Sequence, residues 1–358
     1  MKALILCAGK GTRLRPLTFT NAKQLIPVAN KPVILYSIEN IKNSGIKDIG
    51  IVVNSENREA FQEKLGDGSD YGIKITYILQ QEPKGLAHAV RISKDYIKDE
   101  PFMLYLGDNL IFEDIKEYSE KFLKDDCSAS ILLTPVPNPS QFGIAVLDDH
   151  GNIMKVVEKP KDPPSNFAII GVYFFRKEIF EAIENIKPSW RGEYEITDAI
   201  EYLVENGKKV RAHVIYGWWK DMGRPEDLSE ANRRLLEKLS RRKILGNVDD
   251  IKNVYGVVEI GENSEIVNSQ IRGPVIIGKN TVIKDSYIGP YTSIGNNVFI
   301  QSSEIENSIV MDNTTIINID RRIDNSIIGS NAKLVKTDTR PRVLRFVIGD
   351  YSSFYHSE

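Results

Sequence analysis

The 358-residue sequence is poor in residues that build covalent or metal-based frameworks. It has two cysteines, Cys7 and Cys127, which lie far apart and form no Cys-x-x-Cys pair. This argues against a disulfide framework and against a zinc site, and it suits a reducing, cytoplasmic location. The formal net charge is −2, which disfavours a nucleic-acid partner bound through bulk positive charge.

Long apolar runs are also missing, so we expect no membrane span and no membrane partner. The apolar stretch at 3–9 is followed at once by Lys10, Arg13 and Arg15, without a small-x-small cleavage site. This pattern favours a buried first strand over a signal peptide. Hydrophobic residues make up 41% of the chain and charged residues 27%, a globular balance with material for two domains.

Strand-like and helix-like segments alternate up to about residue 240. We expect strands at 3–7, 49–53, 73–79, 102–106, 129–134, 143–147, 154–157, 169–175 and 210–215, and helices at 32–44, 58–65, 86–97, 179–186, 196–204 and 228–239. Such alternation implies a largely parallel sheet with helices on both faces. The predicted fold class for residues 1–240 is therefore α/β with a Rossmann-like sheet.

After about residue 253 the apolar period changes to six residues. The period is carried by Ile276, Val282, Ile288, Ile294 and Ile300, with glycine and asparagine nearby that tolerate tight corners. A six-residue repeat predicts short strands that stack as a hexapeptide β-helix of roughly four turns over 253–335. An ordinary β-sandwich is the weaker alternative. Residues 336–358 break the repeat and form a predicted C-terminal tail.

The opening stretch MKALILCAGKGTRLRPLT places a glycine loop after the first strand. It lacks the third glycine of a G-x-G-x-x-G dinucleotide motif, where Leu14 stands, and it is not a P-loop. Gly9 and Gly11 allow the backbone N–H groups to approach phosphate oxygens, and Arg13 adds a fork of donors. From the loop alone, a phosphate site and a glycine turn with surface arginines both remain open.

The same stretch, followed by AKQLIPVANKP, resembles the start of the sugar-1-phosphate nucleotidyltransferases. Further segments match that family in order: QQEPKGLAHAV, LYLGDNL, FGIAVLD, VVEKPKDPP, IIGVYFF, RGEYEITD and WWKDMG. They span most of residues 1–230. More narrowly, the chain resembles the long forms that use dTTP and glucose 1-phosphate and end in a left-handed parallel β-helix of hexapeptide repeats.

The resemblance implies that a phosphate oxygen of glucose 1-phosphate attacks the α-phosphorus of dTTP, giving dTDP-glucose and pyrophosphate. The nucleophile is already an anion, so catalysis needs cations and positioning rather than a general base. Two other functions stay open: transfer from UTP or to another sugar phosphate, and a non-catalytic regulatory subunit.

By resemblance, the loop and its lysine bind the nucleotide. Arg13 and Lys23 would be catalytic, and the further nucleotide contacts would be Gly9, Gly11, Thr12, Gln24, Gln80, Gly85 and Asp108. Gln80 and Gly85 would read the base edge while Leu86 packs on it; a polar strand end is the alternative account of Gln80. His88 is expected to be structural.

Two acidic residues form a predicted metal pair. Asp108 follows the apolar strand at 102–106, and a carboxylate at the carboxyl end of such a strand suits a ligand crevice. Asp221 is the second acid of the family pattern. Together they would hold Mg²⁺, with phosphates and water completing the oxygen shell. For each residue alone, an aspartate that caps a turn is the competing interpretation.

The resemblance also assigns a sugar-phosphate site. Its residues would be Asn109, Gly143, Glu158, Lys159, Tyr173 and Trp219. Phe142 stands where relatives often have tyrosine, which puts a hydroxyl contact there in doubt, and core packing competes as the role of Trp219. Arg191 and Glu193 are expected to be framework residues.

The repeat region has no histidine between residues 253 and 355, and His356 lies in the tail. Acetyl transfer by such a domain normally requires a histidine general base, so we expect no acetyltransferase activity. Strand edges in a β-helix favour self-association, which predicts a homo-oligomer.

Overall fold

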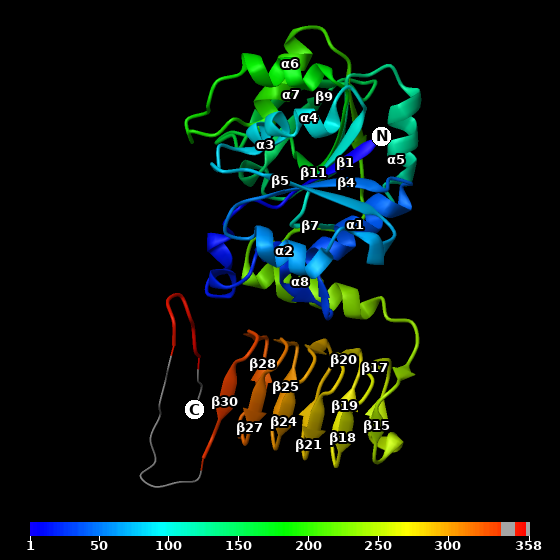
Figure 1. Ribbon diagram of the computed structural model, residues 1–358, viewed down its shortest axis with the longest axis vertical. Helices are drawn as coiled ribbons and strands as arrows, with labels where there is room; N and C mark the ends of the chain where they lie inside the picture. Colours follow the sequence, from blue (N-terminus) through cyan, green and yellow to red (C-terminus); the bar gives the residue numbers. More distant parts are fainter. Residues whose placement is uncertain (338–347, 356–358) are drawn as a thin grey trace. The chain divides into compact units, whose positions relative to one another are not determined.

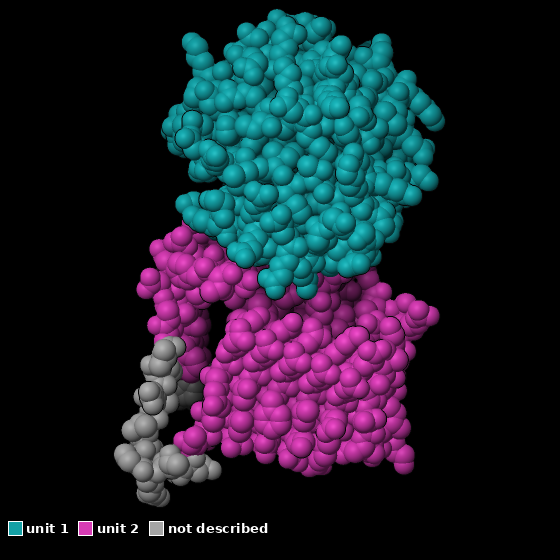
Figure 2. Space-filling model, in the orientation of Figure 1, with its two compact units in different colours: residues 1–10, 33–221 teal, residues 11–32, 222–358 magenta. Residues whose placement is uncertain are grey.

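The computed structural model describes residues 1–337 and 348–355, and the chain divides into two compact units. The first unit comprises residues 1–10 and 33–221, and the second comprises residues 11–32 and the chain from 222 onward (Figure 2). From Gly11 onward, the glycine loop therefore belongs to the same unit as the repeats. The domain limits at 240 and 253 stay predictions. His356 lies outside the described residues.

The first unit is built on a nine-stranded mixed sheet of order β10-β9-β11-β6-β1-β4-β5, with β8 paired to β11 and β12. The strands are β1 Lys2–Leu6, β4 Asp48–Val53, β5 Lys74–Leu79, β6 Phe102–Leu106, β8 Ala129–Pro135, β9 Gly143–Leu147, β10 Ile153–Glu158, β11 Phe167–Phe175 and β12 Val210–Val214. Strands β6, β1, β4 and β5 run parallel, and β11 runs antiparallel to β6. The predicted α/β class is confirmed.

Helices connect these strands. They are α1 Val33–Asn43, α2 Arg58–Leu65, α3 Leu86–Ile92, α4 Lys94–Ile97, α5 Lys116–Lys124, α6 Glu178–Asn185 and α7 Ile196–Glu205. The helix predicted at 86–97 is interrupted at Ser93, whose buried hydroxyl donates to the carbonyl of Ala89 at 2.8 Å. This competing bond to the preceding turn is a common cause of helix bending.

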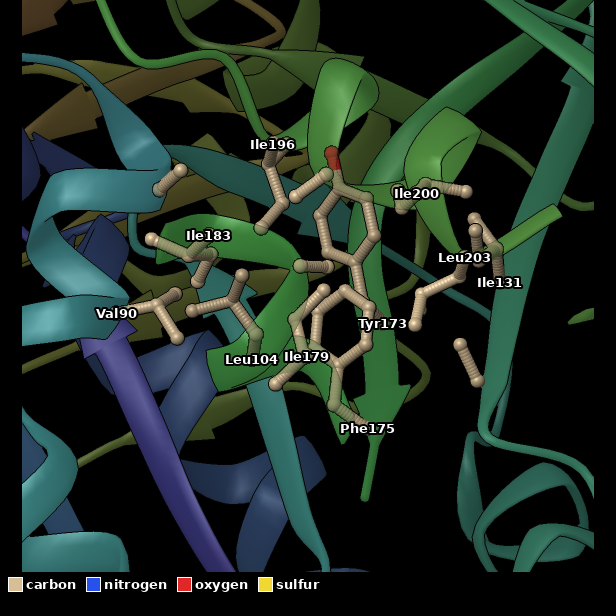
Figure 3. Packing of buried hydrophobic residues seen from close by; sticks show 14 of the residues in the cluster. Val90, Leu104, Ile131, Tyr173, Phe175, Ile179, Ile183, Ile196, Ile200 and Leu203 are labelled. Carbon is tan, nitrogen blue, oxygen red and sulfur yellow. The ribbon is translucent and has the colours of Figure 1, made fainter. Parts of the chain in front are cut away.

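The main core of the first unit packs one face of β11 against α6 and α7. Tyr173 and Phe175 stack with ring centroids 5.7 Å apart, and Ile179 of α6 lies in the same cluster (Figure 3). The inward face of α7 has helical spacing and consists of Ile196, Ala199, Ile200 and Leu203. Burial of this cluster fixes β11, which also carries Gly171 and Tyr173.

The second unit is a left-handed parallel β-helix of three sheets with six, six and five strands (Figure 1). The strands of its coils are β14 Lys243–Ile244, β15 Asn247–Val248, β16 Val254–Tyr255, β17 Val258–Ile260, β18 Glu265–Val267, β19 Gln270–Arg272, β20 Val275–Ile277, β21 Val282–Lys284, β22 Tyr287–Ile288, β23 Thr292–Ile294, β24 Phe299–Gln301, β25 Glu304–Glu306, β26 Ile309–Val310, β27 Thr315–Ile317, β28 Ile323–Asp324, β29 Ile327–Ile328 and β30 Lys333–Val335. The stack is therefore longer than the four turns expected.

In the middle coils the repeat is seventeen residues long, as the pairing of Val258 with Val275 and of Val275 with Thr292 shows. Buried side chains follow one another at repeating steps of six, five and six residues: Ile260, Ile266, Ile271, Ile277, Ile283, Ile288, Ile294, Ile300 and Ile305. Ile276 and Val282 are only half-buried, so the strict period of six was wrong by one residue there. One side of each coil is a residue shorter, and a fixed period cannot follow it.

An asparagine ladder lines one corner of the coils, where each member has a left-handed backbone. Its members, each hydrogen-bonded to the next, are Asn263, Asn280, Asn297, Asn313 and Asn331. Asparagine tolerates this backbone and its amide can both donate and accept, so the ladder supplies corner geometry and coil-to-coil bonds together.

We expect Asn280→Ala to lower the free energy of unfolding by about 2 kcal/mol, because alanine resists the φ of +53° and loses the ladder bonds. Asn280→Gly removes the same bonds but accepts the backbone, so its loss is expected to be about 1 kcal/mol smaller. Denaturant melts of the two variants measure the difference. Equal losses would contradict a role for the backbone conformation.

The end of the glycine loop is tied to the coils by α8 (Pro225–Glu237) and the short hairpin β2 (Pro27–Val28) and β3 (Lys31–Pro32). Buried Asn232 of α8 accepts from the Ala29 N–H and from the Ser293 hydroxyl, both at 2.8 Å. Asn30 donates to the Ile294 carbonyl at 2.6 Å. The residues after the loop are thus fixed on the β-helix.

None of the helices in residues 1–337 and 348–355 has both the length and the apolar character needed to cross a bilayer.

Candidate active site

The glycine loop of the second unit folds as three short 3₁₀ turns, at Thr12–Leu14, Leu17–Phe19 and Lys23–Leu25. Gly11 has a φ of +61°, and a Cβ there would lie 3.1 Å from Lys23 Cβ and from Thr18 Cγ2. The Thr18 hydroxyl donates to the Gly11 carbonyl at 2.8 Å. Because Gly11 has no side chain, the loop can close and bring Lys23 beside it.

The guanidinium of Arg13 lies against Gly223, just before α8. A Cβ on Gly223 would lie 2.9 Å from Arg13 Nη2. The sequence prediction included Asp221 but missed Gly223, although WWKDMG contains both. Thr12 and Gly9 are exposed. Gly11 therefore shapes the loop backbone beside Lys23, and Gly223 leaves space for the Arg13 guanidinium.

Gln24 lies on the last 3₁₀ turn and is 1% exposed. Its Oε1 atom has no hydrogen-bond partner among the described residues. A buried acceptor left without a partner costs about 1–3 kcal/mol. The buried Oε1 atom of Gln24 is therefore available to accept a hydrogen bond.

The first unit brings the two predicted metal ligands to one edge. Asp108 follows β6, and the next residues form β7 (Asn109–Ile111), which pairs antiparallel with β13 (Trp219–Asp221). Asp221 stands opposite Asn109, the neighbour of Asp108. Two carboxylates that are distant in sequence are therefore carried by facing backbone segments.

Asn109 links the metal pair to the predicted sugar residues. Its Nδ2 donates to Asp108 Oδ1 at 3.1 Å, and its Oδ1 accepts from Trp219 Nε1 at 2.6 Å. The Trp219 ring meets the Phe142 ring edge-on, with centroids 5.4 Å apart. Trp219 thus makes a directed hydrogen bond in addition to its packing. Phe142, which stands where relatives often have tyrosine, contributes an aromatic contact and no hydroxyl.

Gly171 of β11 shapes this corner and was missed by sequence reasoning. Its φ is +74°, and a Cβ there would lie 3.0 Å from both Cγ and Oδ1 of Asn109. We expect Gly171→Ala to displace Asn109 and to lower kcat/KM by about a hundredfold, since a shift of about 1 Å near an active site has effects of that size. Steady-state kinetics measures this loss. A variant with unchanged kcat/KM would contradict the positioning of Asn109 by Gly171.

The donor set at this edge fits a hard divalent cation. Asp108 and Asp221 supply carboxylate oxygens, and the described residues contain no group of three or more histidine, cysteine, aspartate or glutamate side chains able to hold a metal. Mg²⁺ is commonly bound through one or two carboxylates with substrate phosphates and water as its other ligands. Asp108 and Asp221 fit a site of this kind, in which the protein supplies only two of the ligands.

A second cluster gathers three predicted sugar residues. A Cβ on Gly143 would lie 3.2 Å from Glu158 Oε2, so this glycine makes room for the carboxylate. The Thr197 hydroxyl donates to Glu158 Oε2 at 3.2 Å, and Lys159 Nζ lies 3.4 Å from Glu158 Oε1. Thr197, which the sequence analysis did not single out, orients Glu158 from the first turn of α7.

Arg191 holds this cluster together. Its guanidinium lies 3.6 Å from Glu158, 3.1 Å from Glu193 and 3.3 Å from Glu195. Burial raises the pKa of Glu195, and the charge of Glu158 raises it further. Burial followed by the Glu158 charge also raises the pKa of Asp198. The positive charge of Arg191 therefore offsets the mutual repulsion of the neighbouring carboxylates of Glu158, Glu193 and Glu195.

Tyr173 lies in the core, with 3% of its surface exposed (Figure 3). Burial raises the pKa of its hydroxyl, and the nearby charge of Glu158 adds to the effect. The hydroxyl thus stays neutral. Its aromatic ring contributes packing beneath the Glu158 cluster.

The predicted base-reading residues are also brought together. Gln80 is buried; its Nε2 donates to the Gly85 carbonyl at 3.3 Å and lies 3.0 Å from His88 Nδ1. Gly85 has a φ of +100°, and a Cβ there would be 2.5 Å from the Tyr194 carbonyl oxygen. Burial, then Arg91, lowers the pKa of His88, so its neutral ring can accept from Gln80. His88 is structural in this arrangement.

Comparison with known proteins identifies the family of the chain. The nucleotidyl transferase family matches residues 2–238. A glucose-1-phosphate thymidylyltransferase from Streptomyces antibioticus is 48% identical over 98% of this chain and 98% of its own length. The low-salt glycan biosynthesis nucleotidyltransferase Agl11 from Haloferax volcanii is 47% identical over 98% of this chain and 99% of its own length.

A solved structure shows the same relationship. The crystal structure of UDP-glucose pyrophosphorylase complexed with UDP-glucose is 28% identical, with a TM-score of 0.61 over 66% of this chain and 98% of that one. The match to relatives covers the β-helix as well as the sheet, since the Streptomyces and Haloferax proteins align over nearly the whole chain. The resemblance inferred from the sequence motifs is confirmed, and the chain belongs to the nucleotidyl transferase family.

Proposed function

We propose that the protein transfers a thymidylyl group from dTTP to glucose 1-phosphate, which forms dTDP-glucose and releases pyrophosphate. The observation that carries this proposal is the full-length similarity, at 48% identity, to a glucose-1-phosphate thymidylyltransferase. The clusters around Gly11, Asp108 and Glu158 supply residue types suited to a triphosphate, a divalent cation and a sugar phosphate.

In this proposal Arg13 and Lys23 neutralise the triphosphate of dTTP, and Arg13 also stabilises charge that develops at the α-phosphate. Gly9, Gly11 and Thr12 contribute backbone N–H groups at the phosphates. The phosphate of glucose 1-phosphate is an anion, so these residues need only align it and offset its repulsion from the nucleotide. No residue has to remove a proton.

Asp108 and Asp221 would hold Mg²⁺. When bound, this ion offsets negative charge on the phosphates and helps to orient them. Asn109 would keep Asp108 oriented through its hydrogen bond. The role of the two carboxylates is to hold the cation while leaving most of its coordination positions to phosphate and water.

The sugar phosphate would be recognised by the second cluster of the first unit. Glu158 accepts hydrogen bonds from sugar hydroxyls, and Lys159 gives a point charge to the phosphate. Thr197 and Arg191 hold the Glu158 carboxylate in place. Gln80 and the backbone at Gly85 would read the pyrimidine edge.

The test is a substrate panel with pyrophosphate release as readout. We expect kcat/KM for dTTP with glucose 1-phosphate to exceed that of every other pairing of dTTP, UTP, ATP or GTP with glucose 1-phosphate or N-acetylglucosamine 1-phosphate by about tenfold or more. Omission of Mg²⁺ should abolish turnover. A higher value with another pair would overturn the substrate assignment while leaving the family unchanged.

Uridylyl transfer is the second candidate. The similarity to a UDP-glucose pyrophosphorylase structure favours it, and a hydrophobic pocket discriminates weakly against one methyl group on the base. The UTP arm of the same panel distinguishes the two reactions. Homo-oligomer formation also stays a prediction, which light scattering of the full-length protein can test.

A further inference from the structure

The C-terminal segment reaches the glycine loop within the second unit. The guanidinium carbon of Arg15 lies 4.8 Å from the centroid of the Phe19 ring and 5.7 Å from that of Tyr351. The two rings are 5.9 Å apart and tilted by 45°. A cation that faces two aromatic rings is attracted to both. This three-residue contact, Arg15 with Phe19 and Tyr351, is called the tail clasp below.

The tail clasp is formed by side chains that would otherwise remain in solvent. Phe19 is 49% exposed and Tyr351 is 67% exposed even in the contact. Tyr351 also has a left-handed φ of +63°, which is uncommon for an aromatic residue. Such a backbone persists where its surroundings hold it, and the Tyr351 ring contacts both Arg15 and Phe19.

The same loop touches the last part of the β-helix. A Cβ on Gly329, directly after β29, would lie 3.5 Å from Leu17 Cδ2. Arg15, Leu17 and Phe19 therefore have contacts with the C-terminal part of the chain, while Arg13 lies two residues before Arg15. The last coil of the β-helix and the segment around Tyr351 therefore both contact the loop that would bind the triphosphate.

We propose that Tyr351 is a positioning residue for the glycine loop. Through the tail clasp it holds Arg15, and this restricts the conformations available to Arg13 and the neighbouring N–H groups before nucleotide binds. This inference rests on the proposed binding of a nucleoside triphosphate by that loop. A loop ordered in advance loses less conformational entropy on binding, so the expected effect is on affinity for the triphosphate.

The test compares Tyr351→Ala with two matched variants of the full-length protein. Tyr351→Ala should raise KM for dTTP about tenfold and leave kcat within about twofold, because it loosens the loop before binding and not in the transition state. Tyr351→Phe should behave as wild type, since the ring and not the hydroxyl faces Arg15. Tyr355→Ala removes an aromatic residue that is 93% exposed on the same segment, and should also behave as wild type.

Arg15→Ala gives an independent arm. It should raise KM for dTTP to a similar extent, and the Arg15→Ala, Tyr351→Ala double variant should be no worse than either single variant because both changes remove the Arg15–Tyr351 contact. Additive losses would contradict the tail clasp. Equal KM values for Tyr351→Ala and wild type would also overturn the proposal, as would a Tyr351→Phe variant as weak as Tyr351→Ala.

Direct binding separates this inference from the proposed function. Equilibrium titration with dTTP in the presence of Mg²⁺ should show about tenfold weaker binding by Tyr351→Ala than by wild type, whichever sugar phosphate the enzyme accepts. If wild type binds dTTP but does not transfer it to glucose 1-phosphate, the proposed reaction fails and the tail clasp is still tested. If wild type binds no nucleoside triphosphate, both proposals are overturned together.

Discussion

Asp221→Asn is expected to lower kcat by about a thousandfold or more while the protein stays folded. Asparagine keeps the size of the side chain but lacks the negative charge that would attract a divalent cation. The pairing of β13 with β7 uses main-chain groups, so the local structure should persist. Steady-state kinetics over a range of Mg²⁺ concentrations, with circular dichroism as a check of folding, measures the effect.

Asp108→Asn should have a loss of similar size, and the double variant should be little worse than either single one because residues acting as a unit are not additive. Asp126→Asn is a suitable control, since Asp126 is an exposed acid paired with Lys209. Activity in Asp221→Asn near that of wild type would overturn the metal assignment. A second result would also overturn it: Asp221→Asn loses activity, excess Mg²⁺ does not restore that activity, and the variant binds Mg²⁺ as tightly as wild type.

Much of the sheet unit could be predicted from the sequence because each element is encoded locally. Apolar runs such as Phe102–Leu106 and the helical spacing of Ile196, Ile200 and Leu203 mark strands and helices without reference to distant residues. The break at Ser93 could not be found in this way, because a serine within a helical pattern is compatible with either continuation or bending.

The β-helix shows the limit of periodicity. Its apolar repeat is evident, but the coil has a five-residue side, and the position that faces inward moves accordingly. Ile276 and Ile277 are adjacent isoleucines, and only the pairing of Ile277 with Ile260 and Ile294 identifies the inward one. Register in a coil is decided by neighbours seventeen residues away, which a short window does not contain.

The candidate site residues also divide into those that the sequence predicts and those that only the structure identifies. Side chains with a proposed chemical function, such as Arg13 and Asp108, stand in motifs, so the sequence alone suffices to predict them. Gly223 and Gly171 act by lacking a side chain where Arg13 and Asn109 must fit, and Thr197 acts by holding Glu158. A glycine that leaves space for a distant residue has no local signal, so these positions required the three-dimensional structure.

Arg13→Ala is the second large expected effect, with a loss of about a thousandfold in kcat/KM. An arginine that stabilises charge in phosphoryl transfer is commonly worth that much or more. Arg13→Lys keeps the charge but loses the planar fork of donors, so we expect an intermediate loss. Arg234→Ala, a change on the exposed surface of α8, serves as the control for removal of an arginine from this unit.

Gly223→Ala extends this prediction to the backbone that supports Arg13. The new methyl group would lie 2.9 Å from Arg13 Nη2, so the guanidinium must shift. We expect a loss of about tenfold or more in kcat/KM in wild type but little further loss when the change is made in Arg13→Ala, where no guanidinium remains to be displaced. The test measures kcat/KM for wild type, Gly223→Ala, Arg13→Ala and the double variant. If Gly223→Ala lowers kcat/KM by the same factor with and without Arg13, Gly223 acts through something other than Arg13.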